Sequence, residues 1–304
     1  MQLFVAQYFA IYSFVGVVAL LAWWGIYQLV LARGYPVREA VFGNRPNAAV
    51  AMDLLGGMLA TGVLIYAAVR NLPFKSLWQD VQTVSVTLVG MLVMLAVVRL
   101  FIAAGLHLWF GETFDAQGDR VNLNNELFKQ RNLATSLFST VLYLILATGM
   151  LQLDLLNVWG YRLQGVYNML GIWLLGTILI VLHSFLYLGY GPRNNVLHEC
   201  FHDNNPAAPL SLLGLTGGFL LLTNHILNQF KAFEHIFNTV EIWWALGSML
   251  IFVLVARGVL QLVLYWTVGI NLRRQLVIND NAAWGLLDGG LIFILCLILI
   301  ALTV

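Results

Sequence analysis

The chain contains eight long apolar stretches, each close to the length that a helix needs to cross a bilayer. A membrane-spanning helix takes about 20 predominantly apolar residues. Charged residues, Pro, Asn or Gly bound these stretches, which cover residues 5–32, 47–69, 82–107, 132–153, 163–190, 208–229, 242–267 and 282–304. Runs such as LIFILCLILIALTV do not alternate apolar and polar residues as the strands of a membrane barrel do. The sequence therefore predicts an all-α integral membrane protein with eight transmembrane helices.

The composition excludes a soluble globular protein. Hydrophobic residues make up 61% of the chain and charged residues only 10%, whereas soluble domains carry about 25% charged residues. We therefore expect membrane lipids to cover most of the surface. A net charge of +1 predicts no nucleic-acid partner. The widely separated Cys200 and Cys296 indicate neither a disulfide framework nor a thiol redox motif.

Four loops share one sequence plan: an acid or amide, a few apolar residues, then Asn and small residues that lead into a Gly-rich span. In three copies the first polar residue precedes the Asn by six positions, whereas in the first copy the separation is eight. The pairs are Glu39 with Asn47, Glu126 with Asn132, Glu199 with Asn205, and Gln275 with Asn281. The motif therefore divides the chain into repeated segments.

Longer-range offsets relate the two halves of the chain. An offset of 158 positions links Asn47 to Asn205, Gly56 to Gly214 and Arg99 to Arg257. The offset between the second and fourth motif copies is 149. We predict two parallel four-helix repeats, residues 1–155 and 156–304, related by a pseudo-twofold axis along the membrane normal.

The motif and the four-span unit resemble the inner-membrane family known as domain of unknown function 350. The resemblance implies two tandem units in a bacterial inner membrane, possible membership of envelope-stress and membrane-maintenance systems, and no established activity that could be carried over. Loops after the odd-numbered spans hold nine Lys and Arg residues and the other loops hold four. Because Lys and Arg favour cytoplasmic loops, we expect both termini to be periplasmic.

Four Asp or Arg residues lie inside the predicted spans, where charge is expensive and is a functional hypothesis by default. They are Asp53, Arg99, Arg257 and Asp288. We expect the aspartates to neutralise the arginines in the bundle interior, with the pairing left open. These pairs either fix the register of the helices or form part of a polar pathway for ions or protons.

The Asn that opens each even-numbered span is a strong candidate for a helix N-cap. The alternative is a ring of four Asn side chains around a cytoplasmic vestibule that favours an anionic group. Glycines early in these spans predict close helix packing, and discontinuous helices of the transporter type are the alternative.

A second polar feature is the stripe of Asn224, His225 and Asn228 in the sixth span, with His183 in the fifth. We expect interhelical hydrogen bonds from this polar stripe. A proton-sensitive element is the alternative, because the imidazole pKa lies near neutrality.

His198 and His202 share one helical face, as the ligands of membrane desaturases and hydroxylases do. Such di-iron sites need about eight histidines in several boxes, and the chain has six in all. The chain also lacks a P-loop, a dinucleotide fingerprint and a nucleophile elbow. We therefore expect no metal, no cofactor and no catalytic residue.

These features favour a non-enzymatic scaffold or accessory component of an envelope-maintenance system. Its partners would be membrane proteins or a second copy of the chain. The main alternative is a small-solute or ion pathway through the pseudo-symmetric core. A lipid-modifying metalloenzyme is the third hypothesis.

Overall fold

In a computed structural model, residues 2–70, 76–109, 118, 121–153, 162–188, 195–231 and 239–302 can be described, and all regular structure among them is helical. Eight helices are long and apolar enough to cross a membrane, which confirms the predicted fold class. The long helices are α1 (Gln2–Ile26), α3 (Ala48–Arg70), α4 (Leu77–Trp109), α6 (Leu133–Met150), α7 (Arg162–His183), α9 (Ala207–Lys231), α10 (Thr239–Val268) and α11 (Ala282–Leu302).

Short helical segments precede the four Asn-led spans, where the sequence predicted only loops. They are α2 (Val37–Phe42), α5 (Leu123–Phe128), α8 (Val196–Phe201) and the π-helical turn Arg274–Ile278. Two further π-helical turns, Tyr27–Leu31 and Ser184–Leu188, continue α1 and α7. Each of the four segments that precede an Asn-led span turns the chain back toward that span. Side chains of the loop therefore approach the start of the helix.

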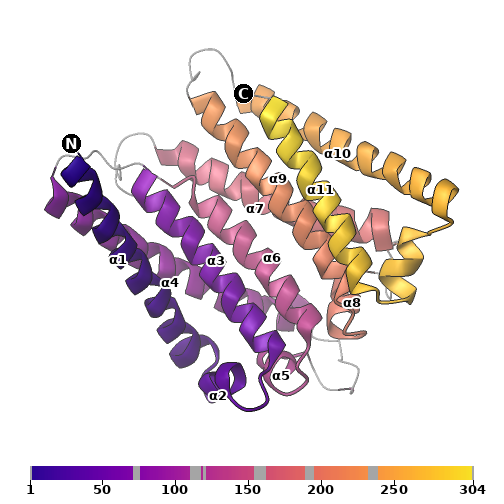
Figure 1. The fold of residues 1–304 in the computed structure, drawn as a ribbon, viewed down its shortest axis with the longest axis horizontal. Helices are drawn as coiled ribbons and strands as arrows, with labels where there is room; N and C mark the ends of the chain where they lie inside the picture. Colours follow the sequence, from indigo (N-terminus) through magenta and orange to yellow (C-terminus); the bar gives the residue numbers. More distant parts are fainter. Residues whose placement is uncertain are drawn as a thin grey trace. The chain divides into compact units, whose positions relative to one another are not determined.

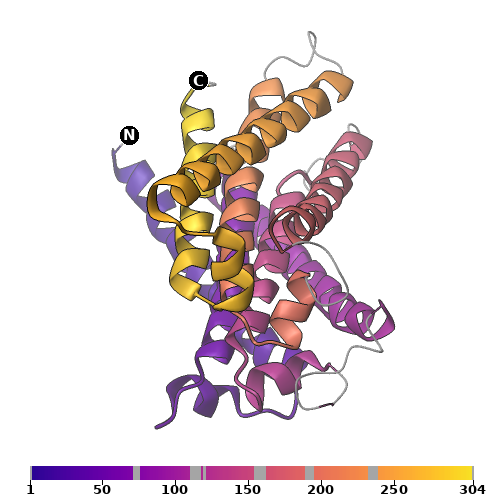
Figure 2. The same cartoon turned by 90° about the vertical axis from the view of Figure 1, so that its right-hand side faces the viewer.

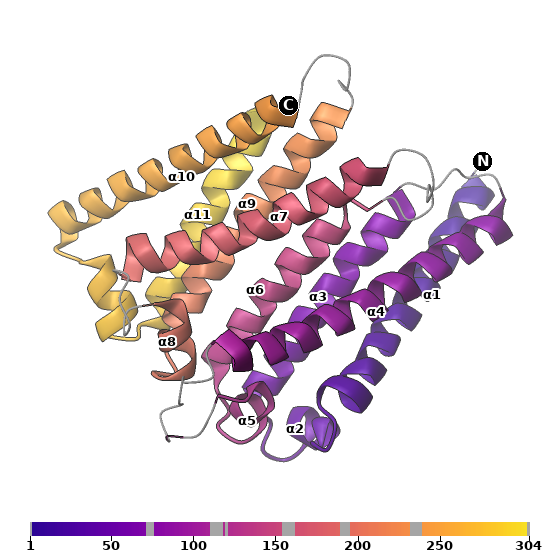
Figure 3. The same cartoon turned by 180° about the vertical axis from the view of Figure 1, so that it is seen from behind.

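The chain divides into two compact units, Met1–Leu175 and Gly176–Val304. The boundary predicted at residues 155 and 156 lies outside the described residues. Each unit contains two Asn-led spans that pack directly against each other, α3 with α6 in the first unit and α9 with α11 in the second. These ribbons run side by side in Figures 1 and 3.

In the first unit, a glycine allows α3 and α6 to approach closely. A Cβ atom at Gly56 would lie 3.0 Å from the Cα of Thr140, a separation that side-chain carbons rarely adopt. Helix α1 covers α3 and α4 on another side. Small residues at such contacts let helix backbones approach where lipid offers no hydrophobic drive for association.

In the second unit, α9 and α11 meet backbone to backbone, and α10 packs on both (Figure 2). A Cβ atom at Gly214 would overlap the backbone of Gly289. The repeat offset of 158 relates Gly56 to Gly214, and the offset of 149 relates Thr140 to Gly289. Within each unit, the two Asn-led spans therefore meet at positions that correspond between the units.

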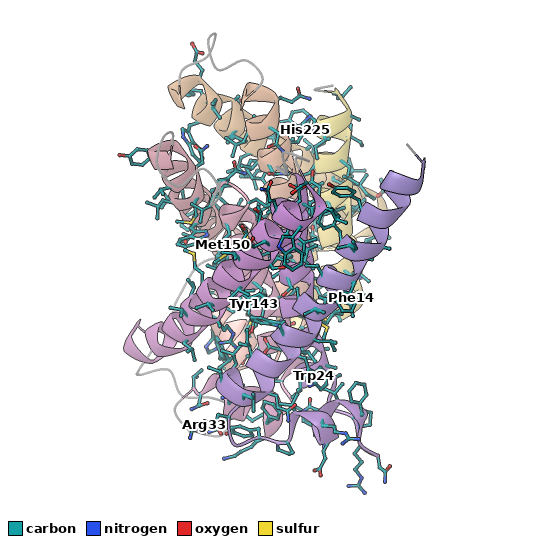
Figure 4. The ribbon with its side chains drawn as sticks, turned by 90° about the vertical axis from the view of Figure 1, so that its left-hand side faces the viewer. Phe14, Trp24, Arg33, Tyr143, Met150 and His225 are labelled. Carbon is teal, nitrogen blue, oxygen red and sulfur yellow. The ribbon has the colours of Figure 1, made fainter. Side chains whose placement is uncertain are left out.

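The outward faces of the helices are apolar, as a lipid-bathed protein requires. Phe14 on α1 is 69% exposed and Trp266 near the end of α10 is 83% exposed. Tyr143, by contrast, is buried inside the first unit, and Figure 4 shows it among the helices while Phe14 lies on α1. The polar chemistry of the spans is thus turned inward.

Candidate functional site: two buried charge clusters and the turns above them

The first unit contains a buried cluster around Asp53 and Arg99. An Nη atom of Arg99 on α4 lies 3.7 Å from Oδ2 of Asp53 on α3. The hydroxyl of Tyr27 donates to the same carboxylate oxygen at 2.8 Å. The Nε–H of Arg99 donates to the hydroxyl oxygen of Tyr143 on α6, also at 2.8 Å. Four helical segments therefore meet at this charge pair. The two charged side chains and the two tyrosines that bond to them are each at most 4% exposed.

The second unit contains a tighter pair. The guanidinium of Arg257 on α10 engages Asp288 on α11 through two contacts, one of which joins Nε to Oδ1 at 2.6 Å. Ser211 on α9 donates to the other carboxylate oxygen. The Nε2 atom of His183 lies 3.0 Å from the Ser211 hydroxyl. A buried chain of polar groups thus runs from the imidazole through the serine to the ion pair.

The aspartate and the serine exchange places between the two units. Adding the offset of 158 to position 53 gives Ser211, and adding 149 to position 139 gives Asp288. In the first unit, Ser139 on α6 lies within hydrogen-bonding reach of Asp53. Each unit therefore contains one Arg, one Asp and one Ser at this position, with the carboxylate on the second span in one unit and on the fourth span in the other.

Tyr143 accounts for the difference in pairing. The offset of 149 relates Tyr143 to Ile292, which has no hydroxyl group. In the first unit the tyrosine accepts the Nε–H of Arg99, and the Arg99 guanidinium also lies 5.5 Å from the centre of its ring. In the second unit no such oxygen is present at position 292, and both donating sides of Arg257 turn to the carboxylate.

A second set of polar contacts lies in the turns before the Asn-led spans. The side-chain amide of Asn132 donates to Oε2 of Glu126 at 2.9 Å, and that of Asn205 donates to Oε2 of Glu199 at 2.6 Å. In the fourth copy Asn281 donates to the amide oxygen of Gln275 at 3.3 Å. A charged carboxylate is therefore not needed to hold the turn, because an amide oxygen accepts the same bond.

The first copy departs from this geometry. Glu39 is exposed, and its backbone oxygen accepts from Gly43 instead of from the Asn. In the other copies the residue before the Asn has a left-handed backbone; these residues are Arg131, Asn204 and Asp280, with φ of 57°, 56° and 46°. The first copy has Pro46 at this place, and proline fixes φ near −65°. Its turn therefore needs the longer spacing of eight residues, and this spacing leaves the Glu39 side chain exposed instead of bonded to the Asn.

Each Asn side chain also caps its helix. The side-chain oxygens accept backbone N–H bonds from Ala49, Thr135, Ala207 and Trp284, respectively. The Asn that opens the second span of each unit makes one more bond, to a turn of the fourth span. Asn47 donates to the Leu127 carbonyl at 2.7 Å, and Asn205 donates to the Leu276 carbonyl at 2.5 Å. The bonds of Asn47 and Asn205 tie the two Asn-led spans of each unit together at their starts.

The acids of the turns and of the spans complement one another in these described segments. The two spans that carry an intramembrane aspartate follow a turn with an exposed acid or an amide. The two spans that carry serine instead follow a turn with a buried glutamate. Every Asn-led span is therefore accompanied by one buried carboxylate, and these are Asp53, Glu126, Glu199 and Asp288.

Glu199 has the electrostatics of a group poised near neutrality. Burial raises the pKa of Glu199 to about 7; the hydrogen bond from Asn205 opposes this, and the charges of Asp203 and Asp280 add to it. The neighbouring Cys200 is also buried, which raises the pKa of its thiol well above the usual range. That thiol stays protonated at neutral pH and makes a poor metal ligand.

The predicted polar stripe is only partly brought together with the clusters. His183 contacts Ser211 and thereby the second charge pair. The remaining residues of the stripe lie half-buried on α9, where Figure 4 labels His225. His198 lies within α8 and His202 directly follows it, with the two rings stacked 4.5 Å apart.

Several residues of these clusters escaped the sequence analysis. Tyr27 and Tyr143 are hydroxyl residues inside apolar helices, and nothing in their local sequence marks them as partners of a charge pair. Ser139 could have been found, because the offset of 149 relates it to Asp288. Ser211 could have been found, because the offset that relates Asn47 to Asn205 also relates Asp53 to Ser211. Asp203 could also have been found, since it directly follows His202.

Comparison with known proteins yields one family. The family model described as Domain of Unknown Function (DUF350) matches residues 2–151 and 161–303, which together cover nearly the whole chain. No curated protein and no solved structure matches the chain. The two matched segments correspond to two copies of the family's unit in tandem.

Proposed function

Because the chain belongs to the DUF350 family and carries two copies of its unit, we propose that it is a non-catalytic, membrane-embedded scaffold. The chain is a multi-pass membrane protein with eight candidate spans. We place its action in the bacterial inner membrane, with both termini periplasmic, as an accessory component of a system that maintains the envelope. The envelope setting rests on the family resemblance and on the loop charges.

One observation carries the scaffold proposal: both intramembrane charge pairs are closed within their own units. Asp53, Arg99, Arg257 and Asp288 are each at most 5% exposed, and each contacts an opposite charge. Charges that served a conducting pathway would line a water-filled cavity. Charges that neutralise each other fix helix register instead, because a slipped helix would leave one of them unpaired in hydrocarbon.

The glycine contacts support the same conclusion. The Asn-led spans of each unit approach so closely that a methyl group at Gly214 would overlap the opposite backbone. A rigid core of this kind leaves the outer helices to meet other molecules. In the second unit α10 presents Trp244, Phe252 and Trp266 outward, each more than half exposed. Such a face suits lateral contact with lipid or with another membrane protein.

A flux assay tests the scaffold proposal. We expect purified protein in liposomes to leave the rates of proton and potassium leakage at the protein-free level, with a peptide ionophore as the positive control. In cells, a photoreactive amino acid at Trp244 or Trp266 should give discrete protein crosslinks, and one at the buried Tyr143 should give none. Flux above the protein-free level, or crosslinks to lipid only, would contradict the proposal.

A proton pathway is the second candidate, and one contact favours it. In the second unit His183, Ser211, Asp288 and Arg257 form a continuous buried polar chain. An imidazole joined through a hydroxyl to a carboxylate can pass a proton along hydrogen bonds. If this chain conducts, His183→Gln should abolish proton flux while Asn228→Gln leaves it unchanged. The same liposomes therefore separate the two functions.

A further inference from the structure

Helix α8 and the turn after it, together called the α8 turn here, bring three potential metal ligands together. The Nδ1 atom of His202 lies 2.9 Å from Oδ1 of Asp203, and the Nε2 atom of His198 lies 3.6 Å from Oδ2 of the same carboxylate. All three ligand atoms lie within 4.8 Å of one another. In the described part of the chain, no other three His, Cys, Asp or Glu residues form such a group.

The spacing of these atoms suits a single small cation. Nitrogen and oxygen ligands bind zinc at about 2.0–2.2 Å, so two ligands of a tetrahedral site lie roughly 3.3 Å apart. The separations of 2.9 Å and 3.6 Å, which involve the two different oxygens of the Asp203 carboxylate, lie on either side of that value. Rotations of the exposed side chains would adjust them, because His202 and Asp203 are 48% and 39% exposed.

The backbone of this turn does not require these side chains. The turn after α5 has the same hydrogen bonds, with corresponding residues 73 positions earlier. The N–H of Lys129 donates to the Asn125 carbonyl at 2.9 Å, and the N–H of His202 donates to the His198 carbonyl at 2.8 Å. Both turns then pass through one left-handed residue, with φ of 57° and 56°. The fold is therefore the same with and without the ligands.

The residues at the three corresponding places differ in chemistry. Helix α5 and the turn after it carry Asn125, Lys129 and Gln130, of which none is a good metal ligand at neutral pH. The α8 turn carries two imidazoles and a carboxylate. Asp280 adds a further negative charge near Asp203. The α8 copy of this turn thus has three potential metal ligands and a nearby acidic residue, and the α5 copy has neither.

We propose that His198, His202 and Asp203 form a binding site for one divalent transition-metal ion. Two imidazole nitrogens and one carboxylate group favour zinc, cobalt, nickel or copper over magnesium and calcium, which prefer all-oxygen sites. Three protein ligands leave at least one coordination position for water, as in zinc sites that are not purely structural. The site lies in a loop that the charge distribution predicts to be cytoplasmic, and it is independent of the scaffold proposal.

Metal titration of the full-length protein tests this inference. The protein is purified in detergent, its affinity tag is removed, and it is stripped with a chelator. We expect one zinc or cobalt ion per chain at micromolar free metal, measured by equilibrium dialysis and elemental analysis, and no binding of magnesium. Bound cobalt should give a visible absorption spectrum.

The turn after α5 supplies the matched variants. A triple variant, His198→Asn with His202→Lys and Asp203→Gln, should lose metal affinity at least about 100-fold and keep its thermal stability. The reverse variant, Asn125→His with Lys129→His and Gln130→Asp, should bind a second ion per chain. Wild-type protein that binds no ion, or a triple variant that still binds one with wild-type affinity, would overturn the proposal.

Discussion

Both units neutralise a buried arginine, but the aspartate that does so comes from different spans. Each places an arginine in its third span and a single aspartate against it, but the first unit draws the aspartate from α3 and the second from α11. The first pair is loose and is supplemented by Tyr27 and Tyr143, whereas the second pair is bidentate and is supplemented by a serine. The comparison teaches that the repeat preserves the neutralisation of the arginine. It does not preserve which helix supplies the aspartate.

Breaking the ion pairs gives the largest expected effect. Removing one partner of a buried pair costs about 3–5 kcal/mol in soluble proteins. We expect Asp288→Asn to destabilise the protein more than Asp53→Asn, because Arg99 keeps its bond to Tyr143 while Arg257 keeps only Ser211. Unfolding in an SDS titration of detergent micelles measures this, with the exposed Glu39→Gln as control. Equal losses in both units would show that the tyrosine contributes nothing.

Moving the carboxylate within a unit sharpens the comparison. Asp53→Ser alone should cost about as much as breaking the pair, roughly 3 kcal/mol. Adding Ser139→Asp gives the first unit the arrangement of the second, so the double variant should regain more than half of the loss. The same SDS titration measures both variants. A double variant no more stable than Asp53→Ser would mean that the two helices are not interchangeable in this role.

Glycine substitutions test whether the two helix contacts are equally tight. Overpacking a well-filled contact costs about 1–3 kcal/mol. Gly214→Ala should reach the upper end, because its methyl group meets the Gly289 backbone, and Gly56→Ala should cost less, because it first meets the Thr140 side chain. Gly247→Ala is the control, since nothing lies within 4 Å of its Cβ position. Melting temperatures in detergent rank the stabilities of the three variants. A Gly214→Ala variant as stable as the wild type would contradict the close contact with Gly289.

The pH dependence of the second unit gives the smallest effect. The pKa of Glu199 is raised from 4.5 to about 7 on folding, so the folded protein binds the extra proton between these values. Its contribution to stability is present below about pH 4.5 and is lost as the pH rises through about 7. A shift of this size is worth about 3 kcal/mol without screening, and screening by nearby solvent reduces it to on the order of 1 kcal/mol. Glu199→Gln should remove this slope, as measured by melting with a chelator present. A slope unchanged in that variant would assign it to another group.

Much of the fold follows from the sequence, since continuous apolar runs of bilayer length have few alternatives to helices. The span predicted at 47–69, for example, corresponds to α3 at Ala48–Arg70. The span predicted at 82–107 was too short at its start, because α4 begins at Leu77. The stretch Ser76–Val84 contains Gln and Asp, and the buried Asp80 accepts a hydrogen bond from Tyr8 on α1. A tertiary contact of this kind cannot be read from local hydrophobicity.

The candidate sites divide in a similar way. Charges inside apolar runs stand out in a sequence, so Asp53, Arg99, Arg257 and Asp288 could be singled out together. Their partners could not be assigned, because helix order alone does not say which face of a span meets which neighbour. The hydroxyl groups of Tyr27 and Tyr143 carry no sequence signal, because tyrosines also lie at exposed positions of these helices, as Tyr66 does.

The exchange of aspartate between spans has a consequence for synthesis. As the chain emerges from the ribosome, Asp53 is made before Arg99, so the arginine of the first unit enters the membrane when its counter-ion is already present. In the second unit Arg257 precedes Asp288 by 31 residues, and only the neutral Ser211 awaits it. An insertion intermediate in which α10 has entered the bilayer and α11 has not would therefore hold an uncompensated cation, and entry of α11 neutralises it.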